Sequence, residues 1–193
     1  MSDTTATTTR SFEGLTIPAP GTFAIDTSHS SVEFVARHLM VSKVRGRFDS
    51  FAGTITVADD PLASSVEVSI DVASVNTGEE GRDQHLRSGD FFEAEQHPTL
   101  TFRSTAVRHV GGNEFAVDGE LAIKGVQRPI TLPATLEGVA GDPWGGQRVA
   151  VESTIEIDRE EFGLTWNQAL ETGGVLVGKK VKIERAVQAV RPG

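Results

Sequence analysis

An acid, hydroxyls and an imidazole lie close together near the start of the chain, in the run Asp26-Thr27-Ser28-His29-Ser30. These are the groups of a hydrolytic triad, which needs a nucleophilic serine on a sharp turn beside donors for the oxyanion. The sequence has no Gly-x-Ser-x-Gly turn, and Ser30 leads directly into an alternating strand. Because groups so close in sequence usually order a turn, we expect that role here. The alternative is an enzyme that acts on a small hydrophobic substrate through an Asp/His pair.

The histidines do not form a metal-binding pattern. None of them is separated from another by the helical i, i+4 or strand i, i+2 spacing that gathers ligands. The chain contains no cysteine, which excludes thiolate zinc sites, disulfides and iron–sulfur clusters. No GxGxxG or Walker-type glycine-rich loop is present for a nucleotide phosphate. We therefore expect no metal and no cofactor. The histidines are His29, His38, His85, His97 and His109.

The densest polar cluster is the segment 76–86, which includes Arg82 and His85. Thr77 and Glu80 have the spacing of a capping box, which predicts a short helix with Thr77 as its N-cap, ending near residue 89. Arg82 and His85 are candidates for holding the polar head of a ligand at the mouth of a barrel. The structural alternative is that Arg82 and Asp83 fix the helix to strand ends. If the protein is an enzyme, His85 and Asp83 are a second candidate acid–base pair.

Apolar side chains are the strongest candidates for ligand contact. For any single residue core packing is the simpler interpretation, but the set would form an apolar interior suited to an elongated apolar ligand. We predict a lining of Phe34, Phe48, Phe91, Phe92, Phe102, Phe115 and Leu121, with Trp166 beside Arg82 and His85 at the mouth.

Strict alternation of apolar and polar residues dominates from Thr22 onward. It is seen at residues 32–36, 51–58, 66–72, 115–123, 149–157 and 181–187. A period of two predicts strands with one dry face, which is typical of antiparallel sheets. We count about eight strands, and closing them into a barrel removes their exposed edges. The sequence thus predicts an all-β, eight-stranded antiparallel barrel with one or two short helices, and a two-sheet sandwich is the competing architecture.

Composition narrows the organisation and the partners. Residues 1–21 are expected to be disordered or extended, and residues 22–190 to form one domain. The formal net charge of −9 argues against nucleic acid as a partner. No apolar run is long enough to be an integral membrane segment, and the first residues do not resemble a secretory signal, so a cytoplasmic location is expected.

A series of short motifs across residues 22–188 resembles the YceI-like proteins in its residues, order and spacing. They are Asp26-x-x-His29-Ser30-x-Val32-x-Phe34, Ser42-Lys43-Val44-Arg45-Gly46-Arg47-Phe48, Asn76-Thr77, Arg82-Asp83-x-His85-Leu86, Asp90-Phe91-Phe92, His97-Pro98-Thr99, Gly119-x-Leu121-x-Ile123-x-Gly125-Val126, Arg159-x-x-Phe162-Gly163 and Gly178-x-x-Val181-x-Ile183.

This resemblance implies a lipocalin-like barrel with an apolar central cavity. It also implies binding of polyisoprenoid chains, including isoprenoid quinones, without a known reaction. Many members of the family are periplasmic. We therefore expect a protein that stores or transports a polyisoprenoid or quinone-type lipid and is not an enzyme. The sequence leaves open whether the chain forms a homodimer.

Overall fold

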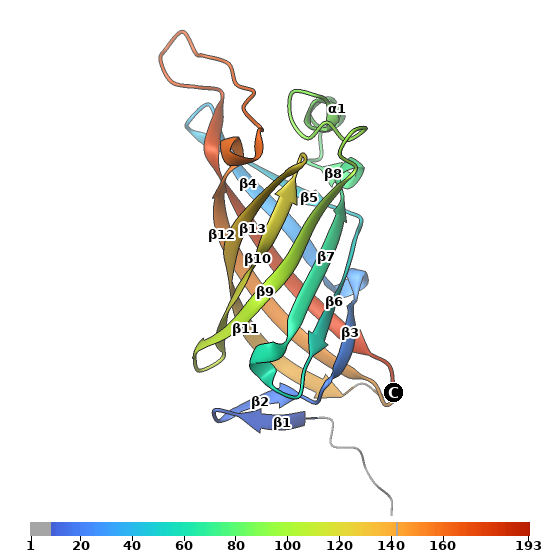
Figure 1. Cartoon of the computed structure of the whole chain (residues 1–193). Helices are drawn as coiled ribbons and strands as arrows, with labels where there is room; N and C mark the ends of the chain where they lie inside the picture. The colour runs from blue at the N-terminus through green and yellow to red at the C-terminus, as the bar shows by residue number, and fades with distance from the viewer. Residues whose placement is uncertain (1–8, 142) are drawn as a thin grey trace, which may run out of the picture.

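The computed structural model describes residues 9–141 and 143–193, which are mostly strands (Figure 1). The strands are β1 (Thr9–Phe12), β2 (Leu15–Pro18), β3 (Gly21–Ile25), β4 (Ser31–His38), β5 (Ser42–Phe48), β6 (Phe51–Val57), β7 (Ser65–Asp71), β8 (Val75–Asn76), β9 (Thr99–Gly111), β10 (Glu114–Ile123), β11 (Val126–Gly141), β12 (Gln147–Asp158) and β13 (Val177–Arg191). The helices are α1 (Glu80–Arg87) and the short 3-10 turns η1 (Thr27–His29), η2 (Pro61–Ala63), η3 (Val72–Ser74) and η4 (Arg159–Phe162).

The main sheet closes on itself. Strand β13 pairs with β4 along its first part and with β3 near its end, so β3 and β4 share one barrel position that η1 interrupts. Strands β5 and β6 likewise share the next position, since β5 pairs with β4 and β6 with β3. From there β7, β9, β10, β11, β12 and β13 follow in antiparallel order, and β13 completes the circuit. The predicted eight-stranded antiparallel barrel is confirmed, and the sandwich is excluded.

The two-residue alternation decides which side chains face inward. On β13, Val181, Ile183 and Val187 line the interior, whereas the side chains of Lys180 and Lys182 are exposed. Because one face of each strand is dry, a shift of one residue in register would turn the apolar set outward. The hydrophobic pattern therefore fixes the register of the barrel.

The two ends of the barrel are covered differently (Figure 1). At one end, here called the mouth, lie α1, β8, η4 and the long connection between η4 and β13. At the other end, the base, lies the β1–β2 hairpin, with Ile17 buried and the Phe12 ring stacked on Phe115. Of the predicted N-terminal segment, residues 9–18 form this hairpin, and residues 1–8 lie outside the described residues.

The prediction that Thr77 is the N-cap of the helix is wrong. The N-cap of α1 is Glu79, whose carboxylate accepts hydrogen bonds from the backbone N–H groups of Gly81 and Arg82. Thr77 cannot serve because its hydroxyl donates to Asp83 at 2.6 Å, which keeps it before the helix. The predicted helix itself is present, and it ends at Arg87.

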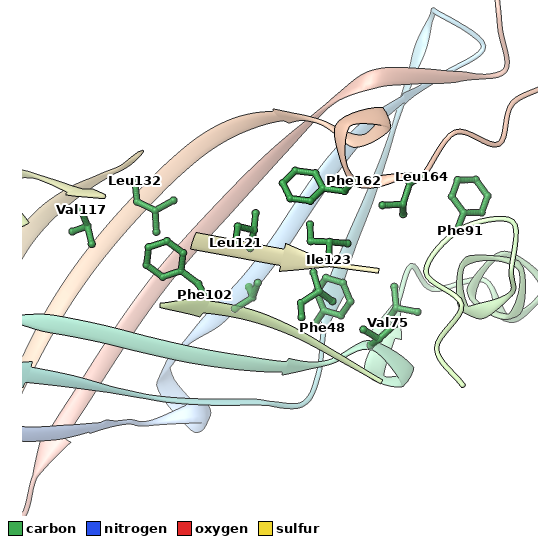
Figure 2. Packing of buried hydrophobic residues seen from close by; sticks show 13 residues of the cluster. Phe48, Val75, Phe91, Phe102, Val117, Leu121, Ile123, Leu132, Phe162 and Leu164 are labelled. Carbon is green, nitrogen blue, oxygen red and sulfur yellow. The ribbon is translucent and has the colours of Figure 1, made fainter. Parts of the chain in front are cut away.

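Buried apolar residues form one large cluster from the mouth into the barrel and a smaller one at the base. Figure 2 shows Phe91, Phe162 and Leu164 near the α1 end, with Leu121 on β10 and Phe102 on β9 deeper in the barrel. The base cluster comprises Phe23, Val57, Val149 and Ala189. Among the described residues, no helix has the length and apolar character needed to cross a bilayer.

Candidate functional site

A cavity of about 340 Å³ lies inside the barrel. Its lining reaches from Ile17 and Pro18 at the base to Phe91 and Leu164 at the mouth, and every barrel strand contributes to it. Nearly all of these side chains are apolar. Such a lining offers dispersion and hydrophobic contact along its whole length and few hydrogen-bonding groups. The polar residues along it are Glu33, Ser64, Ser65, Thr101, Ser153, Arg159 and Arg185.

All seven apolar residues predicted as lining face this cavity, and the structure spreads them over its length. Phe34 and Phe48 lie together toward the mouth, with ring centroids 5.6 Å apart. Phe102 and Leu121 are cross-strand partners on β9 and β10, in the middle of the barrel. Phe115 lies far from them, at the base. The remaining two members of the set, Phe91 and Phe92, follow α1 at the mouth.

At the mouth, aromatic side chains from α1, from the segment after it and from the connection after η4 pack against one another. The His85 ring packs edge-on against Trp166, with centroids 4.6 Å apart, and also against Phe91 at 5.1 Å. Phe92 packs against Phe48 at 5.9 Å. Segments that are distant in the sequence thus meet here, and their rings pack together at the mouth end of the barrel.

Arg82, His85 and Trp166, the predicted head-group residues, are not part of the cavity lining. Arg82 is held by Thr77, donating from Nε to Oγ1 at 2.7 Å and from Nη2 to the carbonyl at 3.0 Å. These bonds give Arg82 a structural role in positioning α1. His85 lies at the mouth, where its ring packs against that of Trp166.

The proposed His85–Asp83 acid–base pair is wrong. His85 Nε2 is 2.8 Å from Asp90 Oδ2, on the segment after the helix. Asp83 is buried and accepts hydrogen bonds from the backbone N–H and hydroxyl of Thr77. The two residues are separated by two positions on α1, so their side chains point to opposite sides of the helix.

Asp26 and His29 do come together, His29 Nδ1 lying 2.8 Å from Asp26 Oδ2. Ser28 donates to Asp26 from its hydroxyl and its backbone N–H, and Arg148 Nη1 donates to Oδ2 at 2.7 Å. The bonds from Ser28 and then from Arg148 and His29 hold the pKa of Asp26 well below its usual range. The group ties η1 to β12, outside the cavity lining, as expected for groups that order a turn.

Arg159, at the start of η4, is a cavity residue that the sequence did not single out for chemistry. Its guanidinium donates to the carbonyls of Leu164, Trp166, Val177 and Gly178, which fixes the connection between η4 and β13 at the mouth. Burial lowers its pKa, although the neighbouring carboxylates oppose the shift. All three donor nitrogens of this buried cation thus have acceptors.

Arg185 and Ser153 are two further polar lining residues that sequence reasoning missed. The available signal was a gap in two apolar alternations, since Arg185 falls between Ile183 and Val187, and Ser153 between Val151 and Ile155. Within the described residues, no three His, Asp or Glu side chains gather as a metal site.

A closed antiparallel barrel around an apolar cavity defines a lipocalin-like class of protein. The YceI-like domain model matches residues 23–189, and the chain therefore belongs to the YceI-like family. It is 41% identical over 168 residues to UPF0312 protein SA2479 of Staphylococcus aureus (strain N315), covering 86% of this chain and 95% of the relative.

Solved structures agree with this assignment. Burkholderia cenocepacia BcnA matches with a TM-score of 0.73 and 26% identity, covering 86% of this chain and 99% of that one. A polyisoprenoid binding domain from Saccharophagus degradans matches with a TM-score of 0.69 over 88% of this chain and 98% of that one. At 19% identity, this second likeness shows the shared fold.

Proposed function

We propose that this protein binds a polyisoprenoid or isoprenoid quinone-type lipid inside the barrel, for storage or transport. The observation that carries the proposal is the cavity of about 340 Å³ whose lining is apolar from base to mouth. The description of the Saccharophagus degradans neighbour as a polyisoprenoid binding domain supports the same ligand class.

The energetics favour a long apolar chain. Apolar surface removed from water contributes about 25 cal/mol per Å², so affinity grows with the length of chain enclosed. The loss of chain flexibility on binding opposes part of this gain. Phe34, Phe102 and Phe115 lie at successive levels of the cavity, so a longer enclosed chain contacts more of them. No chemical step is involved.

The test is extraction and native mass spectrometry of the purified protein, followed by titration with a prenyl quinone. We expect a co-purifying prenyl lipid and saturable uptake. Ile155→Trp places a large ring in the cavity and should abolish uptake, whereas Thr154→Trp, on the exposed face of the same strand, should leave it unchanged. Lipid-free protein that ignores the quinone, or equal uptake by Ile155→Trp, would refute the proposal. Circular dichroism confirms that both variants are folded.

A further inference from the structure

The two arginines that line the cavity have opposite surroundings. Arg159 gives hydrogen bonds to four backbone carbonyls. Arg185 gives one, from Nη2 to Ser153 Oγ at 3.3 Å, and its buried Nε has no partner among the described residues. A guanidinium carries five N–H donors, so most of the hydrogen-bonding capacity of Arg185 is unused.

Arg185 also has no counter-ion among the residues that the structure describes. Among the described lining residues the carboxylate is Glu33, which makes no ion pair with Arg185 and is the cross-strand partner of Arg47. Burial alone lowers the pKa of Arg185 to about 10. The side chain is therefore still protonated at neutral pH, and an uncompensated cation inside an apolar cavity is costly.

The position of Arg185 is set by the register of three strands. It lies opposite Ser153 on β12 and Val32 on β4. The next inward level toward the mouth is apolar, formed by Ile183, Ile155 and Phe34, and the next toward the base is formed by Val187 and Val151. Ser153 and Arg185 therefore make one polar level between apolar levels.

We propose that Arg185 and Ser153 bind the carboxylate of an acidic prenyl lipid that enters the barrel head first. The proposal rests on the function proposed above and names the head group of its ligand. A carboxylate supplies the missing negative charge and two acceptor oxygens that match the planar guanidinium. A neutral quinone carbonyl accepts hydrogen bonds but leaves the cation uncompensated.

The depth of Arg185 sets the orientation of the chain. Eight residues of β13 separate it from Val177 at the mouth, which is about 20 Å along the axis of a barrel with tilted strands. A carboxylate at Arg185 thus places the following chain against Ile183 and Phe34, which are neighbours on one wall of the barrel, and brings its tail toward Phe91 and Trp166 at the mouth.

The experiment compares probes that carry the same prenyl chain: geranylgeranoic acid, geranylgeraniol and a geranylgeranyl benzoquinone. Isothermal titration of lipid-free wild-type protein should show the acid binding roughly tenfold or more tightly than the other two. Arg185→Met should remove this preference and leave alcohol affinity unchanged. Arg45→Met, at an exposed arginine on β5, should keep the preference.

Three results overturn the inference: equal affinity of the wild type for acid and alcohol, tighter binding of the quinone than the acid, or an acid preference retained in Arg185→Met. If Arg185→Met does not fold, Arg185→Gln keeps donors without the charge and should lose the preference in the same way. Failure of every prenyl probe to bind the wild type would instead refute the proposed function. Binding of the alcohol without acid preference would refute the head-group inference alone.

Discussion

Ser153 and Arg185 are direct partners across β12 and β13, and the Arg185 Nη2 donates to the Ser153 Oγ over 3.3 Å inside the barrel. Both positions interrupt an apolar alternation at the same level, so they place a polar contact on the wall of a largely apolar interior. A polar residue at an inward strand position usually affects stability, because the burial of a polar group is costly unless the group is paired. This contact makes Arg185 the most informative residue to substitute.

In the ligand-free protein, Arg185→Met should raise the free energy of unfolding by about 1 kcal/mol or more. Replacing a buried, uncompensated cation by an apolar side chain of similar volume removes its desolvation cost. Urea denaturation measures the change, with Arg45→Met as the control because its guanidinium is exposed. A lower stability of Arg185→Met would mean that the cation is compensated within the chain.

Arg159→Met should have the opposite effect and lower the free energy of unfolding by roughly 2–4 kcal/mol. The backbone carbonyls of Leu164, Trp166, Val177 and Gly178 lose their donor, and the first is buried while the other three are partly buried. The connection after η4 should then exchange its amide hydrogens faster than in the wild type. Equal exchange at Val177 in the two proteins would contradict this account of the mouth.

The fold was largely predictable because a two-residue alternation of apolar and polar side chains indicates both a strand and the face of it that is buried. On β10, Phe115, Val117 and Leu121 alternate with polar residues, and the structure turns all three into the cavity. The tight connection at Gly111 and Gly112 joins β9 to β10, and both glycines have the positive φ that such a short hairpin link requires. The capping-box pattern predicted the wrong N-cap because the Thr77 hydroxyl donates a hydrogen bond to the side chain of Asp83 instead of capping the helix.

The site was predictable in its apolar part and not in its polar part. The lining role of Phe34 and Phe102 follows from their inward-facing positions in the alternation of their strands. The inward position of Arg185 between Ile183 and Val187 follows in the same way, but its contact with Ser153 does not, because only the paired register of β12 and β13 brings the two residues together. Arg82 has a residue type suited to a head group, but no local pattern shows that its donors are already used by Thr77.

Gly119→Ala should destabilise the protein by about 1–3 kcal/mol, because the added methyl group overpacks a position that has no free space around it. A Cβ at Gly119 would lie 2.5 Å from the carbonyl oxygen of Arg103 and 2.5 Å from Cζ of Phe102. The displaced Phe102 ring would also narrow the cavity and weaken uptake of a prenyl lipid. Gly138→Ala is the matched strand control, since nothing lies within 4 Å of its added Cβ. Equal unfolding midpoints of the two variants would show that the ring moves at no cost.

Asp26 should make stability depend on pH. Its pKa is depressed in the folded protein, first by Ser28 and then by Arg148 and His29, so the unfolded chain binds its proton more readily. The stabilisation is therefore complete above the ordinary pKa of an aspartate, near 4, and is lost as the pH falls below that value. At neutral pH, Asp26→Asn should lower the unfolding midpoint.

The same substitution should matter progressively less in acid, because the unfolded wild-type chain then binds a proton at Asp26 that the folded protein does not bind. Urea denaturation of both proteins at about pH 7 and about pH 3 tests this, and the gap between their midpoints should narrow at the lower pH. Asp118→Asn is a useful parallel: its hydrogen bonds to Arg108 and Thr131 lower the pKa of Asp118 to about 2, so it should behave alike. A gap for Asp26→Asn that stays constant with pH would show that the side chain acts through its shape and not through its charge.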